Sequence, residues 1–538
     1  MARATGLPAA IVCTSGTAAA HYLPAIVEAS LAGVSLIAIT ADRPPELQAC
    51  GASQTIDQIG LYGGFVRGAF DLGAPVAHGL RALRRTIVAA ITLARGPAPG
   101  PVHLEVPLRK PLEPALPSTD AERSLARDAA ALCGPVSIAP PHLAADQAVI
   151  ATLAAAITAE PDGVIVAGAL PAGFPRDEVF ALAVRAGYPV IAETGSQLRL
   201  GPRPSGVAMI DHADLIPIAQ RPTPRLVIQL GAEPVAASWP AWLATFGGAQ
   251  RWILAGARWA DPEASARGVI LGDVAGAVAA LVVALGGLDR GATAPAFQAG
   301  TRASQPRIRS TAWLDTWRAA QGLAEAASAR AIESCARSEV AVLRAAIAAA
   351  PAGAMLQIGN SLPIRVVDHL PGGGAPHRVL TQRGAAGIDG LISSAAGATR
   401  GGAPVLLILG DVSFAHDLGG LLAARCASAP LAILVIDNRG GQIFAGLPVA
   451  RAGLGAAFER HWITTPELDP SAIATALGAR AVTAASSAAV GAAIEGALAT
   501  PGVTVIHAPV SVSGAHDVRR AAIELYAPPI RAARGASE

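Results

Sequence analysis

Two apolar runs, each followed at once by oxygen-bearing side chains, constrain this chain more than any other feature. Residues 404–409 (PVLLIL) end at Gly410 and Asp411, and residues 431–436 (LAILVI) end at Asp437 and Asn438. Short apolar runs without alternation predict buried strands of a parallel sheet. The residues between them, with a helix expected from about 417 to 427, would form the crossover. Asp411 and Asn438 should therefore lie at the same ends of neighbouring strands.

The carboxyl ends of such strands are where open α/β sheets bind ligands. Mg²⁺ prefers carboxylate, amide, main-chain and phosphate oxygens, so Asp411, Asn438 and the Gly440 carbonyl are candidate metal ligands. Glycine lets the backbone approach a phosphate closely, so the glycines around these ligands suit a phosphate-bearing ligand. Gly-Asp and Asn-x-Gly are also common turn formers, so two ordinary strand-end turns are the alternative interpretation.

Composition excludes several classes of function. The chain has 538 residues, a net charge of +2 and 15% charged residues, which does not suggest a nucleic-acid groove or a basic membrane patch. The apolar stretch 274–288 is short and rich in alanine and glycine, so we expect a packed helix there rather than a membrane span. The five cysteines are scattered and form no CxxC pair, which argues against a disulfide framework or a zinc site. We expect a cytoplasmic protein without a signal peptide.

Strand-like and helix-like segments alternate along the chain and predict an α/β fold of three doubly wound parallel-sheet domains. The proline-broken residues 111–141 and the Gly/Ala/Pro/Arg-rich residues 286–309 are predicted connectors. The domains are placed at 1–115, 140–290 and 331–538. The middle domain has no GxGxxG, so a dinucleotide site is not expected there. Strands are predicted at 9–13, 36–40, 102–106, 164–167, 190–192, 225–230 and 252–255. Helices are predicted from Thr17 to about 32 and over 80–94, and hydroxyl groups of residues 14–17 are expected to cap the first of them.

Several longer stretches carry a specific resemblance. They include ADRPPEL (41–47), GPVHLEVPLRKPL (100–112), GNSLPIRVVD (359–368), QRGAAGIDG (382–390) and GGQIF (440–444). In this order the chain resembles the MenD family of thiamine diphosphate (ThDP)-dependent 2-succinyl-5-enolpyruvyl-6-hydroxy-3-cyclohexene-1-carboxylate synthases of menaquinone biosynthesis. ThDP enzymes in general share the Gly-Asp to Asn element, whereas the first, fourth and fifth stretches favour this family over acetolactate synthase or pyruvate oxidase.

The resemblance implies three domains of the ThDP-binding fold: a pyrimidine-binding domain, a central domain and a diphosphate-binding domain. It implies a transferase that decarboxylates 2-oxoglutarate and adds the succinyl-semialdehyde carbanion to isochorismate, with ThDP and Mg²⁺ (or Mn²⁺) as cofactors. In this family ThDP lies between the first domain of one chain and the third of another, so a homodimer or homotetramer is implied.

The resemblance also assigns site residues. Gln54 matches an amide near the substrate, Arg365 and Arg383 match arginines that meet substrate carboxylates, and Ile443 and Phe444 match residues lining the pocket. Surface ion pairs are the alternative for the arginines. The implied cofactor-binding residues are Ser15, Gly16, Thr17, Asn360, Ser361, Ile388, Gly410, Asp411, Val412, Ser413, Asn438, Gly440 and Gly441, of which Ile388 is the apolar wedge between the cofactor rings or, alternatively, a core residue.

Three departures from the family pattern stand out. The family's first strand, its Ser-Pro-Gly-Ser-Arg turn and the helix with the glutamate that activates the cofactor would all precede Met1. We expect Met1 to be an internal methionine of a longer reading frame; the alternative is an impaired short homologue. For the function, the alternatives are a scaffold without catalysis and a carboligase for another 2-oxo acid. Glu105 replaces a common asparagine, and Asp437 and Arg439 flank Asn438 where asparagines are usual.

Overall fold

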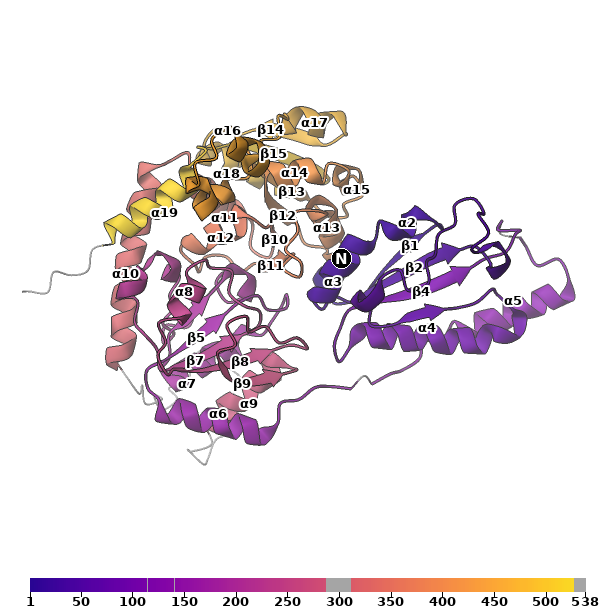
Figure 1. Ribbon diagram of the computed structural model, residues 1–538, viewed down its shortest axis with the longest axis horizontal. Helices are drawn as coiled ribbons and strands as arrows, with labels where there is room; N and C mark the ends of the chain where they lie inside the picture. Colours follow the sequence, from indigo (N-terminus) through magenta and orange to yellow (C-terminus); the bar gives the residue numbers. More distant parts are fainter. Residues whose placement is uncertain (114, 140, 287–310, 527–538) are drawn as a thin grey trace, which may run out of the picture. The chain divides into compact units, whose positions relative to one another are not determined.

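The computed structural model describes residues 1–113, 115–139, 141–286 and 311–526, so the connector predicted at 286–309 lies almost wholly outside the described residues. The chain forms two compact units. One consists of residues 1–143 together with 382–389, and the other of residues 144–381 together with the chain from 390 onward (Figure 1). Each unit is built on parallel sheets.

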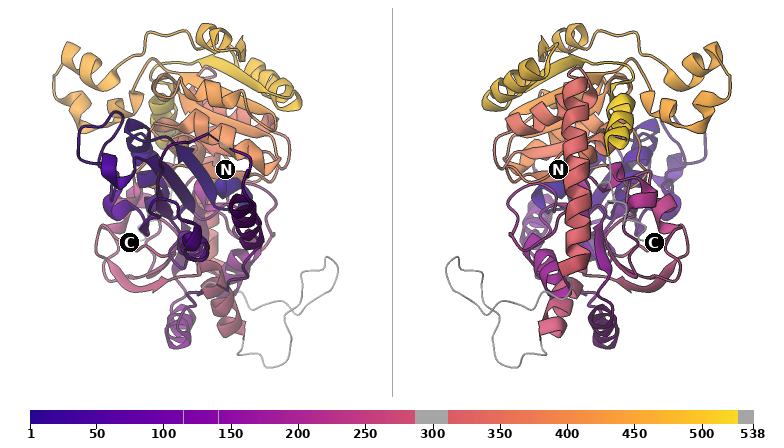
Figure 2. Two further views of the ribbon diagram at one scale, coloured as in Figure 1. Left: turned by 90° about the vertical axis from the view of Figure 1, so that its right-hand side faces the viewer. Right: turned by 90° about the vertical axis from the view of Figure 1, so that its left-hand side faces the viewer.

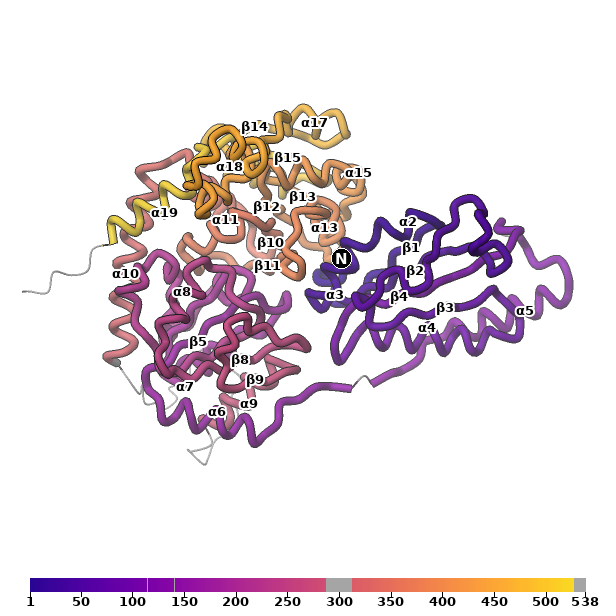
Figure 3. The backbone as a smooth tube through the Cα atoms, viewed as in Figure 1, coloured from indigo at the N-terminus to yellow at the C-terminus, as the bar shows by residue number. Residues whose placement is uncertain are grey.

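The first unit contains a four-stranded parallel sheet in the order β1 (Ala9–Cys13), β2 (Leu36–Asp42), β4 (Pro101–Pro107), β3 (Ala69–Asp71). Successive strand residues point to opposite faces, and the two faces are covered by different helices. Ile37 of β2 packs with α4 (Leu80–Arg95), whereas Ala38 packs with α3 (Leu23–Leu31). The tube in Figure 3 traces this unit. The predicted strands and the helix over 80–94 are confirmed; β3 was not predicted.

Two predictions for the first unit are wrong. The connector at 111–141 contains helix α5 (Asp120–Leu132), which begins with a capping box between Thr119 and Glu122. The helix expected from Thr17 to about 32 is divided into α2 (Thr17–Ala20) and α3, with Pro24 in the first turn of α3. No hydroxyl caps α2, because its N-cap is Gly16.

The second unit begins with a five-stranded parallel sheet in the order β6 (Val190–Ala192), β5 (Gly163–Ala167), β7 (Leu226–Leu230), β8 (Gln250–Ala255), β9 (Ala266–Leu271). One face packs on α6 (Gln147–Ala159), α7 (Arg176–Ala186) and α9 (Val274–Gly286). The other packs on α8 (Trp239–Leu243) and α10 (Thr311–Ser334). The apolar stretch from residue 274 is therefore helical, as expected. In the described ranges, no helix has the length and apolarity to cross a bilayer.

A six-stranded parallel sheet completes this unit, in the order β11 (Arg378–Thr381), β10 (Met355–Ile358), β12 (Val405–Gly410), β13 (Leu431–Asp437), β15 (Val503–Pro509), β14 (Arg480–Thr483). One face is covered by α11 (Glu339–Ala349), α18 (Ser487–Ala499) and α19 (Gly514–Leu525). The two predicted apolar strands are β12 and β13. The helix expected at 417–427 is wrong in its bounds, because α14 (Asp411–His416) begins directly at the strand end and α15 (Gly420–Ala424) follows.

Helix α10 is shared by both sheets of the second unit. Its Trp317 lies in the core of the five-stranded sheet, whereas Ala331 and Ile332 lie in the core of the six-stranded sheet. The helix also packs against α19, and the two run side by side in the right-hand view of Figure 2. The two sheets are thus built around a common element.

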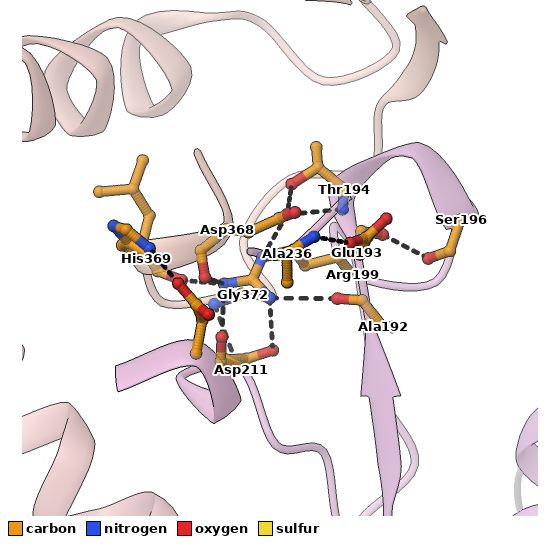
Figure 4. A network of polar contacts seen from close by, with 12 residues as sticks. Ala192, Glu193, Thr194, Ser196, Arg199, Asp211, Ala236, Asp368, His369 and Gly372 are labelled. Carbon is orange, nitrogen blue, oxygen red and sulfur yellow. Dashed lines mark hydrogen bonds and ion pairs between the residues drawn. The ribbon is translucent and has the colours of Figure 1, made fainter. Parts of the chain in front are cut away.

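A buried arginine joins the two sheets (Figure 4). Arg199 is 2% exposed and follows β6; it donates to the carbonyls of Ala192 (3.1 Å), Asp211 (2.9 Å) and Asp368 (2.9 Å). Its guanidinium lies 3.8 Å from the Asp211 carboxylate and 3.9 Å from that of Asp368. The Asp368 carboxylate also accepts from the Thr194 N–H at 2.7 Å. Paired and hydrogen-bonded in this way, the charges can be buried between the sheets.

Arg199→Leu should lower the free energy of unfolding by about 3–5 kcal/mol, because it leaves the buried Asp368 carboxylate without the guanidinium beside it and three buried carbonyls without their donor, although Asp211 keeps its ion pair with Arg203 at 2.7 Å. Urea unfolding would measure the change. Arg318→Leu is the control: Arg318 forms an exposed pair with Asp315 at 3.1 Å, and its loss should change stability by less than about 0.5 kcal/mol. Equal effects of the two substitutions would contradict a joining role for Arg199.

Candidate active site

Asp411 and Asn438 come together at the carboxyl edge of the six-stranded sheet. Gly410, the last residue of β12, lies opposite Ile436 of β13, so the residues that follow leave the sheet side by side. The Asp411 carboxylate accepts from the backbone N–H of Gly440 at 2.7 Å and of Val412 at 2.9 Å. Asp411 therefore holds the turn that carries Asn438.

The Asn438 amide is buried against a glutamate that sequence reasoning missed. Asn438 is 6% exposed, and its Nδ2 donates to Oε1 of Glu339, which is 1% exposed and opens α11. Within the described residues, neither Oδ1 of Asn438 nor Oε2 of Glu339 has a hydrogen-bond partner. Two buried oxygens are thus available to a ligand, since orphaned acceptors are costly in a protein interior.

The charges at this edge favour a cation. Burial raises the pKa of Glu339 to about 7 and the pKa of Asp411 to about 6. Desolvation of two neighbouring carboxyl groups disfavours their charged forms, and a divalent ion would reverse that penalty. The described part of the chain holds no cluster of three or more His, Cys, Asp or Glu side chains suited to a metal. A carboxylate, an amide oxygen and a main-chain oxygen nevertheless suit Mg²⁺, which keeps other positions for phosphate oxygens and water.

The turn after β13 has a conformation that requires glycine. Gly440 has φ 113°, and a Cβ there would lie 2.4 Å from the carbonyl oxygen of Ile463. The Gly441 N–H donates to the same carbonyl at 2.6 Å. The backbone of the turn therefore packs directly against the segment Glu459–Ile463. Gly410 differs, since its φ is −83° and a Cβ there would meet nothing within 4 Å.

Asp437, which departs from the family pattern, supports this turn. Its carboxylate accepts from the Arg439 N–H at 3.1 Å and lies 2.9 Å from Nε2 of His507 on β15. The contact with His507 lowers the pKa of Asp437. Asp437 is thus bonded within the turn and to β15, whereas Oδ1 of Asn438 has no partner among the described residues.

The other predicted residues of the second unit lie near the ends of β10, β12 and β13. Asn360 is buried just beyond β10, the neighbour of β12. Ser361, with φ 70°, precedes the short helix α12 (Leu362–Val366), and its carbonyl accepts from Arg365 at 2.7 Å. After the glycine turn, Ile443 packs partly on the core, and Phe444 is 36% exposed. In α14, Ser413 is buried and Val412 half-buried.

In the first unit, the turn 14–17 is bonded to Gln54. The Ser15 hydroxyl donates to the Gln54 carbonyl at 3.0 Å, and Nε2 of Gln54 donates to the Ser15 carbonyl at 3.1 Å. The Gly16 N–H donates to Oε1 of Gln58 at 2.7 Å, and Nε2 of Gln58 donates to Glu105 at 2.9 Å. Thr17 begins α2. Gln58 and Glu105 were not predicted to support the turn, because their contacts span 42 and 47 residues.

The last two predicted residues, Arg383 and Ile388, lie in the segment 382–389. Both are half-buried, and the segment belongs to the first unit. The predicted residues thus form two sets. Ser15, Gly16, Thr17, Gln54, Arg383 and Ile388 belong to the first unit, and the remainder belong to the second.

Family models match both ends of the chain. Residues 1–61 match the thiamine pyrophosphate enzyme N-terminal TPP binding domain, and residues 366–508 match the C-terminal TPP binding domain. The second match contains Asp411 and Asn438.

Curated relatives match most of the chain. The 2-succinyl-5-enolpyruvyl-6-hydroxy-3-cyclohexene-1-carboxylate synthase of Sorangium cellulosum is 39% identical over 89% of this chain and 78% of its own length. The synthase of the same name from Myxococcus xanthus is 37% identical over 89% and 80%, and that of Geobacillus thermodenitrificans is 36% identical over 84% and 74%.

Solved structures with the same fold are more distant in sequence. Benzoylformate decarboxylase from Polynucleobacter necessarius aligns with a TM-score of 0.65 at 16% identity, over 95% of this chain and 88% of its own. A putative thiamin diphosphate-dependent enzyme from Mycobacterium smegmatis aligns with a TM-score of 0.63 at 21% identity, over 95% and 89%. The fold is that of thiamine diphosphate-dependent enzymes.

The raised pKa of Asp411 predicts a specific pH dependence of stability. A carboxyl group whose pKa is raised on folding binds extra protons in the folded state, so its contribution to stability falls as pH rises from about 4 to 7. Relative to that of Asp411→Asn, the free energy of unfolding of the metal-free protein should fall by roughly 2–3 kcal/mol over this pH range. Mg²⁺ with thiamine diphosphate should then raise the melting temperature of the unsubstituted protein at pH 8 and leave Asp411→Asn unchanged.

Thermal unfolding at several pH values, with and without Mg²⁺ and thiamine diphosphate, would measure both effects. Asp315→Asn, which changes an exposed carboxylate of α10, is the matched control and should behave like the unsubstituted protein. A melting temperature of Asp411→Asn that still rises with Mg²⁺ and the cofactor would contradict the assignment of Asp411.

Proposed function

Because this chain belongs to the 2-succinyl-5-enolpyruvyl-6-hydroxy-3-cyclohexene-1-carboxylate synthase family, a family of thiamine diphosphate-dependent transferases, we propose the corresponding reaction for it. The enzyme decarboxylates 2-oxoglutarate, releases CO₂ and adds the succinyl-semialdehyde carbanion to isochorismate. The product is 2-succinyl-5-enolpyruvyl-6-hydroxy-3-cyclohexene-1-carboxylate, an intermediate of menaquinone biosynthesis.

The observation that carries this proposal is that two buried oxygens near Asp411, Oδ1 of Asn438 and Oε2 of Glu339, have no hydrogen-bond partner among the described residues. Asn438 Oδ1 lacks a partner among the residues described, and the Asp411 carboxyl is held by two backbone N–H groups. We assign Asp411, Asn438 and the Gly440 carbonyl as ligands of Mg²⁺ (or Mn²⁺), which would bind the cofactor diphosphate. Gly410, Val412, Ser413 and Gly441 would line the diphosphate, and Asn360 and Ser361 would lie at the same edge.

The bound cofactor would stabilise the negative charge left on the substrate carbon after decarboxylation. The chain's own residues would bind and orient the cofactor and the substrates and shield them from water. Ile388 would supply an apolar surface for the cofactor rings. The turn at Ser15, Gly16 and Thr17, fixed by Gln54 and Gln58, would present backbone groups to the pyrimidine.

The substrates are anionic, and two arginines suit them. Both 2-oxoglutarate and isochorismate carry two carboxylates, and the planar guanidinium pairs with a carboxylate through two parallel hydrogen bonds. We assign Arg365 and Arg383 to these carboxylates, Gln54 to a polar group near the reacting carbon, and Ile443 and Phe444 to the apolar wall. We further propose that the protein is cytoplasmic and forms a homodimer or homotetramer, the assembly that the resemblance implies. Light scattering on the purified protein would measure its mass in solution and so check the assembly.

An assay of the purified chain tests the reaction. With thiamine diphosphate, Mg²⁺ and isochorismate present, 2-oxoglutarate should be consumed and the product detected by mass spectrometry. Pyruvate offered in its place should not react at a comparable rate. Consumption of pyruvate would instead indicate a carboligase with another donor, and no turnover of either acid would overturn the proposal.

Arg365→Ala and Arg383→Ala should each raise KM for a dicarboxylate substrate by about tenfold or more, because a charge-assisted pair is lost. Lysine at either position should restore only part of the affinity. Steady-state kinetics would show the change, with Arg400→Ala, an exposed arginine of the second unit, as the control. An unchanged KM for both substrates would remove that arginine from the proposed site.

A further inference from the structure

A single carboxylate of helix α3 holds the segment 382–389. Glu28 accepts the backbone N–H of Gly384 at 3.0 Å through Oε1 and that of Ala385 at 2.7 Å through Oε2. All three residues belong to the first unit. Each oxygen thus binds one of two successive N–H groups, which fixes both the position and the direction of the backbone there.

The segment also approaches α3 so closely that it requires glycine. A Cβ on Gly384 would lie 2.5 Å from the carbonyl oxygen of Glu28 and 2.9 Å from the backbone nitrogen of Ala32. Both atoms belong to backbone, so neither can move away cheaply. Steric fit and hydrogen bonding therefore specify the same contact independently.

Helix stability does not explain a glutamate at this position. Glu28 lies in the last turn of α3, which ends at Leu31, and a negative charge near a helix C-terminus is unfavourable. Its side chain is 17% exposed, and Arg3 lies 3.7 Å away, beyond hydrogen-bond distance. The two N–H groups of the segment are its close partners, and hydrogen bonds to a charged acceptor are stronger than neutral ones.

We propose that Glu28 is a positioning residue that fixes the segment 382–389 and thereby the side chains of Arg383 and Ile388. Arg383 immediately precedes the first anchored N–H, and Ile388 follows the second by three residues. The inference rests on the proposed function, in which these two side chains meet the substrate and the cofactor. Glu28 itself is not among the residues assigned to the substrates or the cofactor.

Hydrogen–deuterium exchange of the full chain tests the anchor directly. In Glu28→Ala, exchange at the Gly384 and Ala385 amides should become about tenfold faster or more, because two charge-assisted bonds are lost. Alanine favours helix, so α3 and the melting temperature should change little. Gly384→Ala is a second route to the same effect, since its Cβ displaces the segment from α3. Unchanged exchange at 384 and 385 in both variants would overturn the anchor.

Kinetics test the consequence. Glu28→Ala should raise KM for 2-oxoglutarate more than it lowers kcat. Glu28→Gln keeps one acceptor oxygen, so its KM should lie between that of the unsubstituted chain and that of Glu28→Ala. Glu46→Ala, which removes an exposed carboxylate paired with Arg109 at 2.6 Å in the same unit, should alter neither exchange nor kinetics. Faster exchange with unchanged kinetics would overturn the positioning role. If the unsubstituted chain shows no synthase activity, the proposed function fails, and the role toward substrate with it, whereas the exchange data still decide whether Glu28 holds the segment.

Discussion

The alignment of β12 with β13 is the constraint on which the candidate site depends. Because Gly410 lies opposite Ile436, the residues that follow each strand emerge at one edge, where Asp411 holds the Gly440 turn and the Asn438 amide bonds to Glu339. A slip of one residue would turn each side chain to the opposite face. The register of the two strands is therefore as important to the site as the polar residues themselves.

Buried charges of the second unit are paired with opposite charges at one place and left without an opposite charge at another. Around Arg199, carbonyls and two carboxylates converge on a guanidinium, backbone N–H groups donate to the same carboxylates, and the charges are matched within the chain. At Asp411 and Glu339 burial raises both pKa values, and oxygen atoms among the described residues are left without partners. The first arrangement stabilises the fold, whereas the second costs stability that a bound cation could return.

The sequence predicted the parts of the fold and site that depend on local pattern. Strands β12 and β13 were recognisable because both faces are buried and no polar residue interrupts them. Edge strands such as β9 and β14, which are half-exposed and carry arginines, lack that pattern. Glu339 follows Ser338 and reads as an ordinary helix start, and its contact with Asn438 spans 99 residues. Arg199, Gln58 and Glu28 also act through partners far away in the sequence, which periodicity cannot reveal.

Helix α10 has a consequence for how the second unit can come apart. Because Trp317 completes one hydrophobic core and Ile332 the other, neither sheet can release the helix without exposing apolar surface of both. The five-stranded and six-stranded layers should therefore melt as one cooperative block. A swap of either layer for that of a related protein would need to bring a matching half of this helix with it.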